Sequence, residues 1–170
     1  MITTRYRLLL LTLTALICGS VISFLPCQLF ASPPGSLTSA SRWTDLGNGV
    51  LKDGRTGLEW SRDDNGSDID WNDAKAFCDG RSKGWRLPSL GELVAIFDQA
   101  ESGVRCAQSR CGVSSQFNLT GAWFWSATQV GTDATDGDEL AWGVLMVNGA
   151  QTQAVRDASY GSRTLCVRGH

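Results

Sequence analysis

The sequence predicts an α+β domain with two short helices in its first half and a mainly antiparallel sheet in its second half. Two helix start signals support this class: Asp70 stands before one apolar periodic stretch, and Ser89 stands before another. Three later runs, at residues 122–130, 140–147 and 163–168, are rich in aromatic and β-branched residues typical of strands. Helices followed by strands, rather than a regular alternation of the two, favour α+β over α/β.

Residues 1–31 have the features of a secretory signal peptide. Arg5 and Arg7 precede an almost uncharged apolar run at residues 8–25, and Ala31 offers a small residue at a cleavage point. A retained membrane anchor is the alternative, because a spanning helix needs about 20 apolar residues. The small residue at Ala31 favours cleavage, after which no membrane contact is expected.

Residues 32–41 are rich in Ser, Pro, Thr and Gly and are expected to form a flexible leader before one domain at residues 42–170. The formal charge of the whole chain is −2, and removing Arg5 and Arg7 with the signal makes it −4. The overall field of a mildly acidic domain does not steer it to nucleic acid or acidic polysaccharide. We expect a secreted, periplasmic or cell-surface protein with no nucleic-acid partner.

Four cysteines remain after signal cleavage, and an even number in an exported domain predicts two disulfides. Three pairings are possible. We favour Cys106 with Cys111, which can close a tight local loop, and Cys78 with Cys166, which would tie the first helix to the last strand. A zinc site is not expected, because there is no CxxC pair and the only histidine is His170.

Local signals also place the early elements. Residues 50–53 and 58–61 are two short β-prone runs around a glycine-bounded turn, which predicts a hairpin. Asp70 is a suitable N-cap for a helix at residues 71–78. The buried stripe of that helix is expected to comprise Trp71, Ala74, Phe77 and Cys78. The small cysteine loop at residues 103–115 holds few apolar residues and is expected on the surface.

The stretch at residues 84–93, called the joint below, combines a rigid turn with a helix start. Pro88 restricts the backbone, so a helix can begin only after it. Ser89 and Glu92 have the spacing of a capping box, which predicts a helix ending near residues 98–100. Arg86 is expected to bond backbone carbonyls or an internal carboxylate. Structural roles are therefore assigned to Trp85, Arg86, Pro88, Ser89 and Glu92.

Two acidic loops carry oxygen ligands at a density that suits calcium. The first loop offers Asp63, Asn65 and Asp68, but it lacks the glycine and glutamate of an EF-hand, so an ordinary solvated loop is the alternative. The second loop, at residues 131–139, is also interpreted as a polar loop or a calcium site. Its candidate ligands are Asp133, Asp136, Asp138 and Glu139.

Five separated blocks, taken in order, resemble the Lcl C-terminal domain family, first met as the terminal domain of a collagen-like bacterial adhesin. The blocks are residues 56–60, 71–78, 84–93, 124–128 and 166–169. The resemblance covers residues 43–169 and implies a disulfide-stapled fold like that of C-type lectins. The same order of blocks is similar, more distantly, to the formylglycine-generating enzyme group.

The resemblance implies an exported bacterial binding or adhesion-type module that recognises a glycan, or an extracellular or periplasmic protein, through its long loops. Its candidate ligand-binding residues are Asp133, Asp136, Asp138, Glu139 and Trp142. A structural subunit of a surface or pilus-like assembly is the alternative. An enzyme of the formylglycine-generating type would need a reactive thiol pair, whereas these cysteines are better explained as bridges. We therefore expect no catalytic residues and no cofactor other than calcium.

Overall fold

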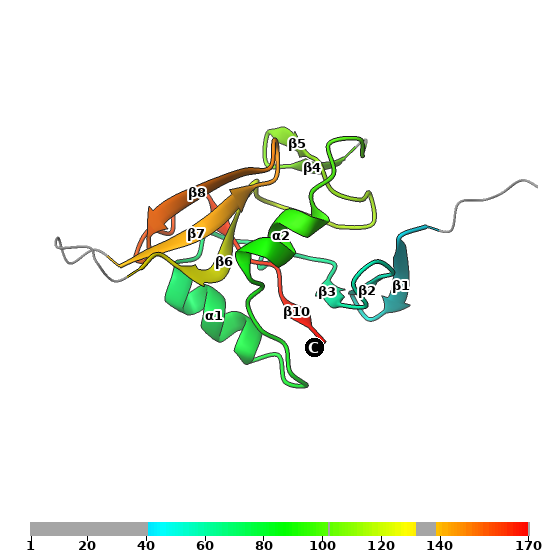
Figure 1. Ribbon diagram of the computed structural model, residues 1–170, viewed down its shortest axis with the longest axis horizontal. Helices are drawn as coiled ribbons and strands as arrows, with labels where there is room; N and C mark the ends of the chain where they lie inside the picture. Colours follow the sequence, from blue (N-terminus) through cyan, green and yellow to red (C-terminus); the bar gives the residue numbers. More distant parts are fainter. Residues whose placement is uncertain (1–40, 102, 132–138, 170) are drawn as a thin grey trace, which may run out of the picture. The chain divides into compact units, whose positions relative to one another are not determined.

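The structure, a computed structural model, describes residues 41–101, 103–131 and 139–169. The expectations for the signal peptide, the leader and Asp133, Asp136 and Asp138 lie outside these described residues. The described part is α+β, with two helices, two four-stranded sheets and a two-stranded hairpin (Figure 1). The predicted class is confirmed, but the strands form two larger sheets where the sequence suggested one.

The first sheet has the strand order β1-β2-β3-β10 and is antiparallel throughout. It comprises β1 (Trp43–Gly47), β2 (Val50–Asp53), β3 (Glu59–Ser61) and β10 (Val167–Arg168). The predicted hairpin is the β2–β3 pair. No strand was predicted for β1, whose only buried residue is Trp43.

The second sheet has the order β8-β7-β6-β9. It comprises β6 (Trp123–Gln129), β7 (Leu140–Leu145), β8 (Ala150–Val155) and β9 (Ser162–Arg163). The β6–β7 and β7–β8 pairs are antiparallel, whereas β9 lies parallel to β6. The long strands β6 and β7 therefore occupy the places that the aromatic and β-branched runs at residues 122–130 and 140–147 predicted.

The prediction of a single last strand at residues 163–168 is wrong. β9 and β10 belong to different sheets, and residues 164–166 carry the chain from one to the other. The Thr164 amide leaves the ladder and donates to Asn65 Oδ1 at 2.9 Å. The alternation of faces is confirmed, because Leu165 and Val167 lie in one hydrophobic cluster and Cys166 in the other.

Helix α1 (Trp71–Asp79) begins after Asp70, whose side chain accepts from the Asp73 amide, as the N-cap signal predicts. Trp71, Ala74 and Cys78 are buried, but Phe77 is 38% exposed, so its place in the predicted stripe is wrong. The other three side chains share one narrow side of the helix, and Phe77 projects beside that side. The ring is instead partly covered by the Arg81 guanidinium, 5.9 Å from its centre.

Helix α2 (Leu90–Ile96) has the predicted capping box: Ser89 Oγ accepts from the Glu92 amide, and the Glu92 carboxylate accepts from the Ser89 amide. The helix ends earlier than predicted. Phe97 is extended, with ψ of 132°, and its ring lies against Gly112 and Gly149. A tertiary packing contact therefore ends the helix where the apolar spacing alone would continue it.

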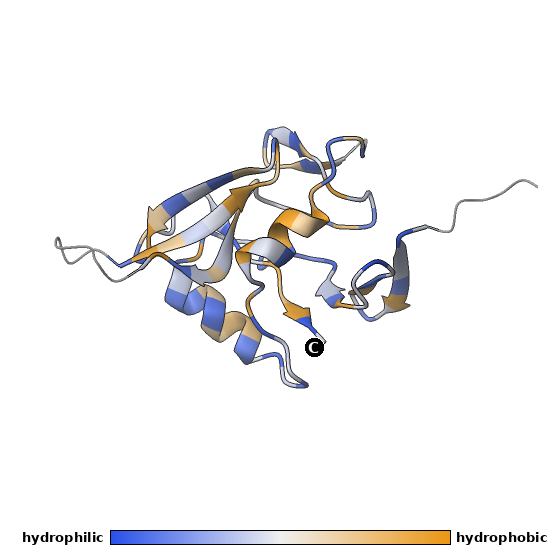
Figure 2. Ribbon diagram, in the orientation of Figure 1, coloured by the Kyte–Doolittle hydropathy of each residue, from blue (hydrophilic) through white to orange (hydrophobic). Residues whose placement is uncertain are grey.

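The two helices pack on opposite faces of the second sheet, because successive strand residues point to opposite sides. Phe124 of β6 lies in a cluster with α2, and its neighbour Trp125 lies in a cluster with α1. Figure 2 shows hydrophobic residues along α2, where it contacts the sheet. The Phe124 and Trp125 side chains are both fully buried, so β6 is buried on both faces near its start.

The cysteine loop forms a hairpin of β4 (Val104–Cys106) and β5 (Ser109–Cys111). The expectation that residues 103–115 lie on the surface is only partly right. Cys106, Cys111 and Val113 are fully buried, while the polar side chains of the hairpin are exposed. The hairpin thus covers part of the core.

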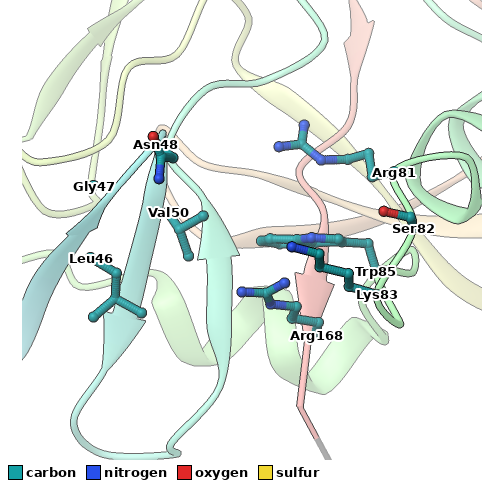
Figure 3. Close-up of a pocket in the computed structure, with 9 residues that line it drawn as sticks. All are labelled: Leu46, Gly47, Asn48, Val50, Arg81, Ser82, Lys83, Trp85 and Arg168. Carbon is teal, nitrogen blue, oxygen red and sulfur yellow. The ribbon is translucent and has the colours of Figure 1, made fainter.

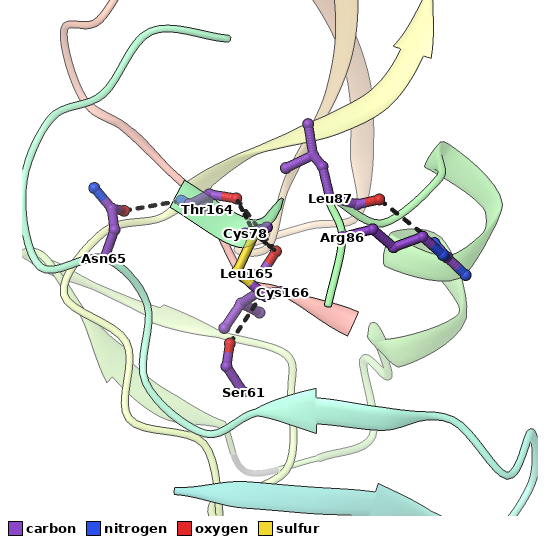
Figure 4. The surroundings of a disulfide bond; sticks show 8 residues. All are labelled: Ser61, Asn65, Cys78, Arg86, Leu87, Thr164, Leu165 and Cys166. Carbon is purple, nitrogen blue, oxygen red and sulfur yellow. Dashed lines mark hydrogen bonds between the residues drawn. A yellow bond between two sulfur atoms is a disulfide. The ribbon is translucent and has the colours of Figure 1, made fainter. Parts of the chain in front are cut away.

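Two disulfides, Cys78–Cys166 and Cys106–Cys111, match the favoured pairing. The first joins α1 to the segment before β10 (Figure 4). Ser61 Oγ accepts from the Cys166 amide at 3.0 Å beside this bond. The disulfide and this hydrogen bond connect the first helix to the first sheet.

Candidate functional site

The joint connects the two sheets through its backbone. The Arg86 amide and carbonyl exchange hydrogen bonds with Val167 of β10, both at 2.9 Å. Two residues later, the Pro88 carbonyl accepts from the Ala127 amide of β6 at 2.7 Å. These contacts fix the segment on which Trp85 stands, so the direction of the indole is set by both sheets.

Arg86 forms a two-pronged ion pair with Glu92, with nitrogen to oxygen distances of 2.8 and 2.7 Å. Glu92 also accepts from the Ser89 amide at 2.7 Å. The hydrogen bond from Arg86 lowers the pKa of the Glu92 carboxyl, against the opposing effect of burial. The same pairing raises the pKa of Arg86. Arg86 also donates to the Leu87 carbonyl at 3.4 Å (Figure 4), so it bonds a backbone carbonyl as well as a carboxylate, the two kinds of partner expected.

A pocket of about 310 Å³ lies next to Trp85 (Figure 3). One wall is the segment after α1, and the facing wall is the turn between β1 and β2. The lining residues are Leu46, Gly47, Asn48, Val50, Arg81, Ser82, Lys83, Trp85 and Arg168. We call this the Trp85 pocket.

The indole of Trp85 holds two guanidinium groups in place. Arg81 lies 5.0 Å and Arg168 4.8 Å from the centre of the ring, and Figure 3 shows them above and below its plane. Such contacts are worth about 0.5 to 2 kcal/mol each, more when water is excluded. Trp85 is only 7% exposed, so its ring positions the two cations and leaves little surface for a ligand to stack on.

The pocket lining carries three cationic side chains and no carboxylate. Arg168 is partly neutralised, because its Nε donates to Glu59 Oε2 at 2.7 Å. Lys83 is exposed at the rim and Arg81 is half-buried. The pocket therefore has a positive field in a domain whose overall charge is negative.

Both walls contain backbone in the left-handed region. Ser82 and Lys83 have φ of +62° and +56°, and Gly84 follows at +75°. On the facing turn Asn48 has φ of +52°. Non-glycine residues in this region cost about 1 kcal/mol or more each, and such positions gather at functional sites. Both walls therefore contain residues in an unfavourable backbone conformation, as binding sites often do.

A second recess of about 340 Å³ lies on the β4–β5 hairpin and is lined by Arg105, Gln108, Ser109 and Arg110. It is slightly larger than the Trp85 pocket, but all four lining residues are exposed. Arg110 donates to the Gly103 carbonyl at 3.3 Å. We regard the Trp85 pocket as the stronger candidate, because a buried ring fixes its cations.

The first acidic loop is bonded to neighbouring segments by its own candidate ligands. Asp63 accepts from Asn118 Nδ2 at 2.8 Å, Asn65 Oδ1 accepts from the Thr164 amide, and Asp68 pairs with Arg163. Asp64 was not among the predicted ligands, and its side chain is buried. Its carboxylate accepts from the amides of Thr120 and Gly121 at 2.6 and 3.2 Å.

The structure describes two of the candidate ligand-binding residues, Glu139 at the end of the second acidic loop and Trp142 on β7. Glu139 is largely exposed and pairs with Arg156, whose guanidinium also lies 4.1 Å from the centre of the Trp71 ring. Trp142 is half-buried on β7, and its carbonyl accepts from Ser126 Oγ at 2.8 Å. Neither residue lines the Trp85 pocket.

No group of three or more His, Cys, Asp or Glu side chains within residues 41–101, 103–131 and 139–169 is arranged to hold a metal ion. Over the same residues, no helix has the length and apolar character to cross a membrane. The calcium prediction for the second loop rests mainly on residues outside this range.

The fold and pocket define a disulfide-bonded α+β domain with a cationic, tryptophan-centred surface pocket. Residues 49–168 match the Lcl C-terminal domain, and the chain belongs to this family. A comparison with curated protein sequences finds no match. The two disulfides are compatible with a secreted or extracellular domain.

Proposed function

We propose that the protein is an exported, adhesin-type binding module whose Trp85 pocket holds an acidic group of a glycan or protein surface. The observation that carries this proposal is the pair of guanidiniums held on the two faces of one buried indole. Arginine is suited to carboxylate, sulfate and phosphate groups because its planar fork donates two parallel hydrogen bonds.

The geometry favours an acidic ligand over a neutral sugar. A neutral sugar is usually held by stacking on an exposed aromatic face, and both faces of Trp85 are already occupied by Arg81 and Arg168. A volume of about 310 Å³ suits one ring-sized group with its charged substituent. Lys83, at the rim, can add a further charge contact.

The negative overall charge of the domain does not oppose this local preference. Charges further apart than about 8 Å are largely screened at physiological ionic strength. A ligand in the pocket therefore responds mainly to Arg81, Lys83 and Arg168. Overall repulsion would slow its approach more than it would weaken the bound state.

The family relationship supports the same class of function. The proposal also includes a fold like that of C-type lectins and ligand contact through the long loops. It further includes a calcium site in the second acidic loop. Both walls of the Trp85 pocket are loops held by regular elements, where binding residues are usually found. The chain is proposed to have no catalytic activity, and its four cysteines in residues 41–169 are all in disulfides.

The test is calorimetric titration of the purified protein with three disaccharides: sulfated, uronic-acid-containing and neutral. Each is titrated with calcium and with a chelator. The proposal expects saturable binding of at least one acidic disaccharide, and binding at least tenfold weaker in R81Q and K83Q. Lys75→Gln is the matched control, because it removes one charge from exposed α1, outside the pocket lining. Equal binding of the neutral sugar, or equal losses in K75Q, would contradict the proposal.

A further inference from the structure

The second sheet leaves β8 (Ala150–Val155) at its edge. Its six residues pair with β7 without a break in register, from Leu140↔Val155 to Leu145↔Ala150. Figure 1 shows β8 along the outer side of β7. An edge strand of this kind presents backbone N–H and C=O groups that another strand can bond.

Two backbone hydrogen bonds of the β7 segment show which β8 residues point their N–H and C=O groups away from β7. The Met146 amide donates to Ala122, and the Leu140 carbonyl accepts from Val130, so even-numbered β7 residues bond towards β6. Because antiparallel ladders alternate, Ala141 and its odd-numbered companions bond towards β8. Their partners are the even-numbered β8 residues. The outward groups are those of Gln151, Gln153 and Val155.

The outward groups are largely unused within the described part of the chain. The Val155 carbonyl accepts from the Ala158 amide at 2.9 Å. For Gln151 and Gln153, no hydrogen bond outside the β7–β8 ladder joins their backbone groups to a described residue. The side chains of all three outward residues are exposed.

β8 also lacks the features that protect other edges of this domain. β1 at the edge of the first sheet is shorter, is interrupted by a register shift between Asp45 and Gly47, and carries an ion pair from Asp45 to Arg62. The other edge strands of the two four-stranded sheets, β9 and β10, have two residues each. β8 has no charged residue, no proline and no bulge over its whole length. Unprotected edges of this length are sites of strand pairing.

We propose that β8 pairs with β8 of a second copy of this chain, in an antiparallel arrangement centred on Gln153. With the odd-numbered residues turned outward, this register places Gln153 opposite its own copy and Gln151 opposite Val155. The two second sheets then form one continuous sheet across a twofold axis. The proposal is independent of ligand binding at the Trp85 pocket.

A second copy suits β8 because a twofold interface sets identical residues near one another. A charged edge would repel itself, whereas β8 brings only Gln, Thr, Ala and Val together. Arg156, which follows β8 in the sequence, is already paired with Glu139 and bonded to Asn72 Oδ1 at 2.9 Å. The glutamine side chains add donors and acceptors across the axis.

The pairing is expected to be weak. A strand of six residues is about 20 Å long, and one such pair buries less than the roughly 1,200 Å² of a stable interface. We expect dissociation constants between about 10 μM and 1 mM, typical of small contacts. Dimers should therefore appear only at high concentration, or where copies are crowded on a surface.

The test is sedimentation equilibrium of the purified protein up to about 1 mM, with charge variants at the twofold axis. Gln153→Lys alone and Gln153→Glu alone should each weaken self-association at least tenfold. A mixture of the two should restore it as a heterodimer. Gln108→Lys is the control, because it adds the same charge to an exposed hairpin residue far along the chain.

Three results would overturn the proposal: a wild-type protein that stays monomeric over the whole range, a Q153K variant that associates like Q108K, or a mixture no tighter than the single variants. The last result would show that the two copies of residue 153 do not face each other across a twofold axis. A fourth contrary result is a protein that binds an unrelated extended peptide at β8 but does not associate with itself. The partner of β8 would then be another protein and not a second copy of this chain.

Discussion

The Cys78–Cys166 bridge is predicted to contribute more stability than the Cys106–Cys111 bridge. The test compares the double variants C78A/C166A and C106A/C111A. All four cysteines are fully buried, so alanine avoids placing a new hydroxyl in the core. The small cavities left by the two variants are similar, so they largely cancel in the comparison.

The expected difference follows from the lengths of the closed loops. The paired cysteines are 88 residues apart in one bridge and 5 in the other. In the chain-entropy treatment the bridges contribute about 4.6 and about 2 kcal/mol, so the difference is about 2.5 kcal/mol. For a domain whose whole stability is about 5 to 15 kcal/mol, loss of the long bridge is severe.

Urea unfolding of the two variants and the wild type, followed by far-UV circular dichroism, measures both losses. C78A/C166A should also show a larger dependence of the free energy of unfolding on urea, because its unfolded chain is less compact. A loss in C106A/C111A equal to or greater than that in C78A/C166A would refute the reasoning. It would mean that local packing of the hairpin matters more than the constraint on the unfolded chain.

Two further variants test the joint and the sheet. The hydrogen bond from Arg86 lowers the pKa of the Glu92 carboxyl in the folded protein. The ionised carboxylate therefore stabilises the fold fully above its unfolded pKa of about 4.3. This stabilisation is lost as the pH falls through the lower, folded pKa. E92Q should therefore be less stable than wild type at pH 7, by about 1 to 3 kcal/mol, and lose less on acidification. Gly143→Ala places a Cβ 2.2 Å from the Trp123 ring, and should cost about 1 to 3 kcal/mol in thermal unfolding.

Each of these variants has a clear contrary result. Parallel pH profiles of E92Q and wild type, from pH 7 down to about pH 3, would show that the ion pair does not set the acid response. For the sheet, Gly91→Ala is the matched control, because nothing lies within 4 Å of an added Cβ there. It should be neutral or stabilising by up to about 1 kcal/mol. Equal losses at the two glycines would contradict the close contact with Trp123.

The features predicted well are those decided within a few residues of sequence. The capping box at Ser89 and Glu92, the N-cap at Asp70 and the β2–β3 turn each depend on local backbone chemistry. The end of α2 could not be predicted in this way. Phe97 leaves the helix because of contacts with Gly112 and Gly149, which are near it only in the folded chain.

The candidate site was missed for the same reason. Arg81 and Lys83 follow α1, whereas Arg168 comes from the last strand, and no periodicity or spacing relates them. Only the sheet order β2-β3-β10 and the backbone bonds of Arg86 to β10 place them around Trp85. The sequence did single out the joint, but it assigned Trp85 to packing alone. Packing and the proposed binding role coincide at Trp85, because the buried ring positions the two arginines.

Binding of acidic ligands at Trp85 can be observed directly in an NMR titration that follows the indole N–H signals. The chain has seven tryptophans, and each indole N–H gives its own signal. Trp71 and Trp125 serve as internal controls, because their indoles bond to the Ser126 and Ile69 carbonyls. A sulfated or uronic-acid disaccharide is expected to shift the Trp85 signal saturably, to leave the two control signals in place and to have no such effect on R81Q. An unmoved Trp85 signal at saturation, or an equal shift in R81Q, would rule out binding at this pocket.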